Sequence, residues 1–203
     1  MDEKLKSAYS LFDKKDYMAA KKLFSEFDMT YEMGLCELLK RNLIEARKCF
    51  EIKKDDCIAS DFGLLIIDII EDSKTRKIPN YFQVRSFLEI YINFFIENNI
   101  LDWAQKVIDN YQFFTQSNLE TPKFIARVLH ANRFYKAVHS FAKLGKEICY
   151  HDAEVHYIDA CVYITEKNYE EAMNCINACL NFAPEYYPML RLKQEVEELF
   201  SQE

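Results

Sequence analysis

Apolar residues recur at steps of three and four positions along almost the whole of the 203-residue chain. Phe134, Ala137, Val138, Phe141 and Ala142 form one such stripe. This spacing places side chains on one face of an α-helix, whereas strands alternate with a period of two. The chain has only three glycines and four prolines, too few for the frequent turns of an all-β fold. The sequence therefore predicts helices joined by short turns.

We expect twelve helices, separated by short polar or proline-containing stretches. They cover residues 3–13, 16–27, 30–40, 43–53, 56–72, 80–97, 101–114, 118–131, 134–149, 152–166, 169–182 and 185–200. All four prolines fall at or near predicted helix starts, where a missing N–H group costs little. Such short connections favour antiparallel packing of consecutive helices.

A second pattern repeats along the chain, in which an aromatic residue or leucine stands three positions before an alanine. The pairs are Tyr17/Ala20, Leu43/Ala46, Leu101/Ala104, Phe134/Ala137 and Tyr169/Ala172. Twelve positions before each alanine stand Ala8, Gly34, Ile92, Ile125 and Ala160, in the same order. Because packed helices approach most closely where side chains are small, we expect Ala160 and Ala172 to lie at the contact within one helical hairpin.

This pattern resembles the tetratricopeptide repeat. The last hairpin carries the signature spacing at Ala160, Tyr163, Tyr169, Ala172, Cys179 and Pro184, and the first carries it at Ala8, Tyr17, Ala20, Phe24 and Phe27. In the middle of the chain Ile92 and Ile125 replace the small residue of the first helix, and a generic α-α repeat explains the pattern equally well.

The resemblance implies an all-α fold, a right-handed α-α superhelix of about five hairpins in a single domain over residues 1–203. The hairpins cover approximately 1–28, 29–54, 80–114, 118–149 and 152–184, with an extra helix at 56–72 and a C-terminal cap at 185–203. In the last segment Met189, Leu192, Val196 and Leu199/Phe200 form one apolar stripe. A solenoid needs such a helix to cover its open end, and a docking helix for a partner is the alternative.

The resemblance also implies a protein–protein interaction scaffold that binds a peptide or protein on its concave face. In this family the first helix of each hairpin lines that face, which selects Tyr31, Leu35, Glu89, Asn93, Glu97, His130, Glu154 and Tyr157 as partner-binding candidates. The alternative interpretation places Leu35 and the two tyrosines in the core. Two alternatives to this scaffold role are that the protein is a small acidic chaperone or a subunit of a larger assembly. A third alternative is a helical enzyme such as a hydrolase.

Some tetratricopeptide co-chaperones grip a carboxylate tail with lysine, arginine and asparagine. Asn93 is present here, but Glu89 replaces a clamp lysine, Lys123 replaces an asparagine, and Glu154 with Ile158 replaces the basic pair. The residues therefore argue against a carboxylate clamp.

A net charge of −7 argues against nucleic-acid binding, which depends on clustered lysine and arginine. The start "MDEKLKS" lacks the features of a secretory signal, and the apolar stretch 62–70 is too short to span a bilayer. We therefore expect a cytoplasmic protein without membrane contact. The sequence leaves the oligomeric state open.

The chemical groups suggest neither a metal site nor an active site. Seven cysteines lie within helical patterns, and "CYHDAEVHYIDAC" lacks the close cysteine pair of structural zinc sites. No glycine-rich phosphate loop, Gly-x-Ser-x-Gly or His-Glu-x-x-His motif is present. We therefore expect inert thiols, no cofactor, no metal and no catalytic residues.

Overall fold

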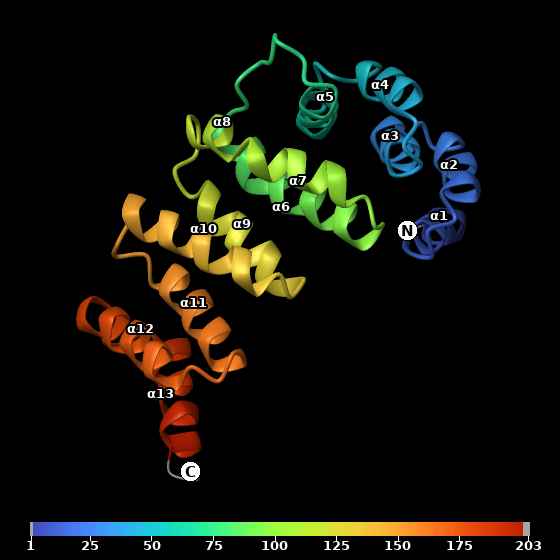
Figure 1. Cartoon of the computed structure of the whole chain (residues 1–203). Coiled ribbons are helices and arrows are strands. Elements are labelled where there is room, and N and C mark those ends of the chain that lie inside the picture. The colour runs from blue at the N-terminus through green and yellow to red at the C-terminus, as the bar shows by residue number, and fades with distance from the viewer. Residues whose placement is uncertain (1, 201–203) are drawn as a thin grey trace. The chain divides into compact units, whose positions relative to one another are not determined.

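The computed structural model describes residues 2–200, and every regular element in this range is an α-helix (Figure 1). The helices are α1 (Glu3–Asp13), α2 (Tyr17–Ser25), α3 (Thr30–Leu39), α4 (Leu43–Glu51), α5 (Ile58–Ile70), α6 (Tyr81–Glu97), α7 (Leu101–Asp109), α8 (Tyr111–Thr115), α9 (Thr121–Ala131), α10 (Tyr135–Ile148), α11 (Ala153–Thr165), α12 (Tyr169–Phe182) and α13 (Tyr187–Phe200). The all-α prediction is confirmed.

The prediction of one continuous helix over residues 101–114 is wrong, because the structure has two helices there, α7 and α8. Asn110 lies at the break, where its side-chain amide donates to the Lys106 carbonyl oxygen at 2.8 Å and its Oδ1 accepts from Arg76 at 2.6 Å. These side-chain bonds offer the backbone an alternative to a continuous helix. Since no glycine or proline marks the break, the sequence pattern did not reveal it.

Internal contacts divide the chain into two compact units, Met1–Phe113 and Phe114–Glu203, which we call unit 1 and unit 2. In unit 1 each helix from α1 to α5 packs against the next, and α5, α6 and α7 pack together. In unit 2 consecutive helices from α9 to α13 pack in pairs, while α11 also contacts both α9 and α13. Helices α9, α11 and α13 therefore lie side by side in unit 2 and form one continuous layer.

One backbone turn ends the first helix of every predicted hairpin. The central residue of this turn has a left-handed backbone conformation, with φ between 58° and 65°. These residues are Lys15, Arg41, Asn99, Arg133 and Lys167. The following residue then donates its N–H to the carbonyl five positions earlier, as Asn168 does to Tyr163 at 2.8 Å. This bond is the signature of the Schellman motif, in which a left-handed residue ends the helix. The five hairpins thus reverse the chain in the same way.

The turn shows that the predicted register of the fourth hairpin was wrong by one residue. Arg133 is the turn residue, so Val138, five positions later, occupies the contact position that was predicted for Ala137. Val138 is fully buried, whereas Ala137 is partly exposed. The same shift replaces the first-helix residue Ile125 with Ala126, which is small and buried.

The other small residues at predicted helix contacts are buried, and Gly34 lies where two helices approach closely. A Cβ atom added to Gly34 would lie 2.4 Å from the Phe50 ring, far inside normal contact distance. The remaining predicted alanines are all buried, namely Ala8, Ala20, Ala46, Ala104, Ala160 and Ala172. The hairpins therefore depend on small side chains at their closest contacts.

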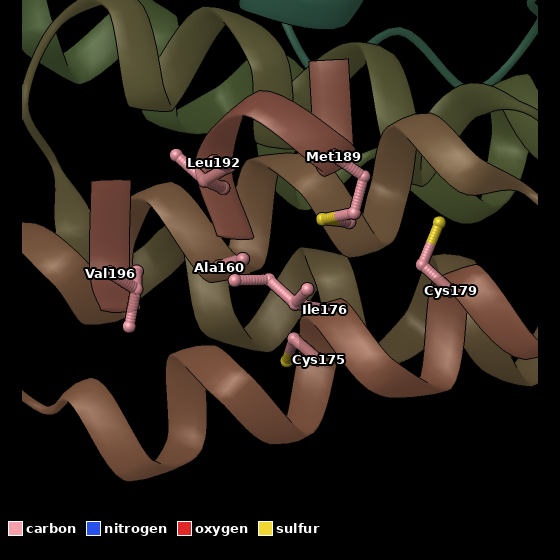
Figure 2. Packing of buried hydrophobic residues seen from close by; sticks show 7 residues of the cluster. All are labelled: Ala160, Cys175, Ile176, Cys179, Met189, Leu192 and Val196. Carbon is pink, nitrogen blue, oxygen red and sulfur yellow. The ribbon is translucent and has the colours of Figure 1, made fainter. Parts of the chain in front are cut away.

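The C-terminal helix α13 closes the core of unit 2 (Figure 2). Met189, Leu192 and Val196 are buried and pack in one cluster with Ala160 and residues of α12. The predicted apolar stripe is confirmed for these three residues. Leu199 is half-buried, and the side chain of Phe200 lies outside the described part of the chain.

We predict that Ala172→Leu lowers the free energy of unfolding by about 1–3 kcal/mol, because three more heavy atoms must enter a fully packed helix contact. Urea unfolding followed by circular dichroism measures the change. Ala137→Leu is the matched control and should change stability by less than about 0.5 kcal/mol, because that side chain is partly exposed. Equal losses in the two variants would contradict the register given above.

Candidate functional site

The structure places the two candidates on α3 partly or wholly in the core of unit 1. Leu35 is only 5% exposed and offers almost no surface to a partner. Tyr31 is partly buried, with its ring 5.8 Å from that of Phe50. Burial raises the pKa of the Tyr31 hydroxyl to about 12. Both residues therefore contribute mainly to packing in this structure.

The candidates on α6 lie on one stripe, at every fourth position. Glu89 and Asn93 are half-buried and Glu97 is exposed. The Asn93 side-chain amide donates to the Glu97 carboxylate at 2.9 Å. Glu89, Asn93 and Glu97 thus form one polar stripe along α6.

The end of α6 is fastened to the first hairpin by contacts that the sequence did not suggest. The rings of Phe12 and Phe94 lie 5.8 Å apart, and the Tyr17 hydroxyl donates to Asn98 Oδ1 at 2.5 Å. Lys15 Nζ donates to the backbone carbonyl of Glu97. Figure 1 shows α6 and α7 inside the curve formed by α1–α5. Within unit 1 the end of α6 therefore packs against the first hairpin.

In unit 2 the candidates lie on the layer formed by α9, α11 and α13. Glu154 on α11 accepts from Arg127 on α9 at 2.8 Å and lies 3.8 Å from Lys123 Nζ. His130 lies one turn beyond Arg127 on α9, and burial lowers its pKa. The structure thus brings Glu154 to the α9–α11 contact, whereas Tyr157 lies one turn farther along α11.

Tyr157 lines a cleft of about 250 Å³ between α11 and α13. The cleft is also lined by Tyr187, Pro188, Arg191, Leu192 and Glu195, all from α13. Sequence reasoning treated α13 as a cap and missed these residues. A usable signal was present, since positions 187, 191 and 195 form a second stripe on α13, beside the buried stripe of Met189, Leu192 and Val196.

The cleft combines aromatic surface with two weakly paired charges. The Tyr187 side chain is 67% exposed and Tyr157 is half-buried. Arg191 and Glu195 stand 3.9 Å apart with side chains 63% and 59% exposed. Electrostatic interaction with Cys161, followed by burial, raises the pKa of Tyr157 to about 12, so its hydroxyl stays protonated at neutral pH. The cleft therefore offers hydroxyl groups, flat rings and one charge of each sign.

A second polar cluster joins α10, α11 and α12 in the interior of unit 2. The Asp159 carboxylate is almost fully buried, accepts from Lys146 and lies 2.5 Å from His139 Nδ1. The Cys175 sulfur lies 3.8 Å from Asp159 and 3.7 Å from Lys146 Nζ. Burial raises the pKa of Cys175 to about 11, which keeps the sulfur as an unreactive thiol. These groups pair with one another and hold three helices together.

His139 completes this cluster by bridging two carboxylates. Its Nε2 lies 3.1 Å from Glu166, and its ring packs 4.3 Å from that of Tyr163. Burial opposes a charged imidazole, but hydrogen bonds to Glu166 and Asp159 outweigh it and raise the pKa of His139. The protonated ring is thus the form that stabilises the contact.

All seven cysteines are free thiols. Within residues 2–200, no three histidine, cysteine or acidic side chains gather in a way that could hold a metal ion. The same part of the chain holds no helix that is both long and apolar enough to cross a membrane.

The sequence matches no protein-family model, and no curated protein matches it either. The tetratricopeptide resemblance therefore remains a hypothesis that the residues themselves support.

We predict that the contribution of His139 to stability depends on pH. Because its pKa is raised in the folded chain, the contribution is full below the unfolded value near 6.5 and is lost as pH rises through the folded pKa. The difference in unfolding free energy between the wild type and His139→Gln should be on the order of 1 kcal/mol near pH 5.5 and shrink toward pH 8.5. Urea titrations across this range measure it. A difference that grows with pH would contradict the assigned bridge.

Proposed function

We propose that this chain is a non-enzymatic interaction scaffold of the tetratricopeptide type, which binds a peptide or protein through the cleft between α11 and α13. The cleft itself is the observation that carries the proposal. It joins Tyr157, selected from the sequence, to exposed groups of a neighbouring helix in the same layer. Tyrosine and arginine are enriched among residues that dominate binding energy at protein interfaces.

The repeated architecture supports the same proposal. In all five hairpins the first helix ends at a residue with positive φ, and small residues are buried at the helix contacts. Stacked hairpins of this kind form a right-handed superhelix in the tetratricopeptide family, with the first helices lining its concave face. In this arrangement α9, α11 and α13 supply the binding surface of unit 2. A cytoplasmic location belongs to the same proposal.

The chemistry of unit 2 is consistent with binding and offers little for catalysis. A nucleophile needs a base and an orienting group that converge on a substrate. In the cluster around Asp159, the histidine, lysine and carboxylates already satisfy one another, and the cysteine is held as a thiol. The cleft, in contrast, carries exposed charges, Arg191 and Glu195, which form a weak ion pair at 3.9 Å. Binding therefore uses the groups that remain accessible.

We predict that Tyr157→Ala weakens capture of a partner by at least about tenfold and leaves the helical circular-dichroism signal intact. The tagged chain is used to purify partners from a lysate of its source organism, and the captured protein is then titrated by calorimetry. Phe82→Ala serves as the matched control, because Phe82 is an exposed aromatic residue of unit 1 outside the cleft.

A second control separates binding from folding. Tyr31→Ala should lower the melting temperature, because Tyr31 packs against Phe50, and any loss of binding should follow from that loss of stability. If Tyr157→Ala and Phe82→Ala both leave partner affinity unchanged, the cleft is not the binding site.

A further inference from the structure

We propose that a cavity in unit 1, between the first hairpin and the end of α6, binds a quaternary ammonium group. The cavity has a volume of about 260 Å³ and is lined by residues of α1, α2 and α6 and of the turns that end α1 and α6. All of these residues belong to unit 1, whereas the α11–α13 cleft belongs to unit 2. The cavity is therefore a second site, which goes beyond the scaffold role and does not depend on it.

Three aromatic side chains form walls of this cavity, namely Phe12 from α1, Tyr17 from α2 and Phe94 from α6. The Phe12 ring lies 5.3 Å from that of Tyr17 and 5.8 Å from that of Phe94, with interplanar angles of 67° and 71°. Rings inclined in this way border the cavity from different directions. Phe12 and Phe94 are half-buried, so part of each ring stays accessible. Cations bind over the faces of aromatic rings, and cages of several rings recognise quaternary ammonium groups.

The charges around the cavity favour a cationic ligand. Asp13 is the last residue of α1 and Glu97 is the last residue of α6, so two helix C-termini, each with a carboxylate, border the same space. A helix C-terminus carries a partial negative charge and attracts cations. Among the described residues that line the cavity, only Lys15 is basic, and its Nζ donates to the backbone carbonyl oxygen of Glu97. The lining therefore keeps a net negative charge.

The hydrogen bonds around the cavity favour a quaternary ammonium group over other cations. Asn98 Oδ1 accepts from the Tyr17 hydroxyl at 2.5 Å, and the Glu97 carboxylate accepts from the Asn93 amide at 2.9 Å. A primary ammonium or guanidinium group needs acceptors for several N–H groups, and a metal ion needs several oxygen ligands. In the part of the chain that the structure describes, the exposed Asp13 carboxylate forms no ion pair. A quaternary ammonium group donates no hydrogen bond, so ring faces and this carboxylate are sufficient to bind it.

We predict that the full-length chain binds choline better than two related compounds. Dimethylbutanol, the neutral carbon analogue of choline, has the same shape without the charge, and ethanolamine carries a primary ammonium group. Each compound is titrated at low salt and followed by heteronuclear NMR, in a buffer free of other organic cations. Choline should bind saturably, with an affinity about tenfold above that of the neutral analogue and about fivefold above that of ethanolamine.

Replacing one wall separates the aromatic contribution from simple apolar contact. Phe94→Leu keeps an apolar side chain but removes a ring, so choline should bind at least about threefold more weakly while the neutral analogue changes by less than about twofold. Phe82→Leu is the matched control, because Phe82 is an exposed aromatic residue of the same helix outside the cavity. Thermal melting verifies that both variants are folded. Equal losses for the two ligands in Phe94→Leu would contradict an aromatic cage.

Removing one carboxylate tests the electrostatic contribution. Asp13→Asn should weaken choline binding by about two- to threefold at low salt and by less at high salt, and it should leave the neutral analogue unchanged. Asp55→Asn removes the same charge from an exposed position of unit 1 outside the cavity and should change neither affinity.

The quaternary ammonium group can come from a small molecule or from a trimethylated lysine of a protein. A Gly-Ser peptide with one trimethyllysine is therefore titrated beside choline, with the unmodified lysine peptide as its control. Tighter binding of the trimethylated peptide identifies a protein as the source, whereas binding of choline alone identifies a small molecule. If neither ligand binds saturably, or if the neutral analogue binds as well as choline, the inference is overturned.

Discussion

The close approach of paired helices at small side chains is the constraint on which the rest of this structure depends. Gly34 shows it most directly, because a single added carbon would collide with the Phe50 ring. Ala160 and Ala172, predicted at this contact in the last hairpin, are both completely buried. When two helices meet this closely, larger residues on either side are left to pack against the next helix. In unit 2, Met189 and Val196 of α13 pack in one cluster with Ala160 and residues of α12.

Polar contacts between helices then determine which side chains remain exposed and accessible to a partner. In unit 1 the contacts of Tyr17 with Asn98 and of Phe12 with Phe94 hold the end of α6 against the first hairpin. In unit 2 the buried Asp159 takes up Lys146 and His139 and ties three helices together. Arg191 and Glu195 form only an exposed pair at 3.9 Å and keep most of their side-chain surface accessible. The α11–α13 cleft thus combines two accessible charges with aromatic surface, and this combination carries the functional proposal.

The candidate site was only partly predictable from the sequence. Tyr157 was found because its hairpin keeps the repeat spacing, which fixes the face of α11 on which it lies. Its neighbours on α13 were missed, because the apolar stripe of that helix explained its presence as a cap. Tyr31 has the same register position as Tyr157 and packs against Phe50, while Leu35, one turn later, is only 5% exposed. A local spacing does not tell which residues of a predicted face meet the core.

The sequence by itself determined the helices, their pairing into hairpins and most of the small residues at the contacts, because these follow from periods of three and four and from near neighbours in the chain. Where one signal was ambiguous, as at Ala137 and Val138, only the left-handed turn at Arg133 fixed the register. The tertiary structure alone decided that α7 ends at Asp109 with Asn110 following, that the end of α6 packs against the first hairpin, and that α13 completes a cleft with Tyr157. These features depend on side chains that meet across long separations in sequence, where packing and hydrogen bonding, and not local periodicity, select the arrangement.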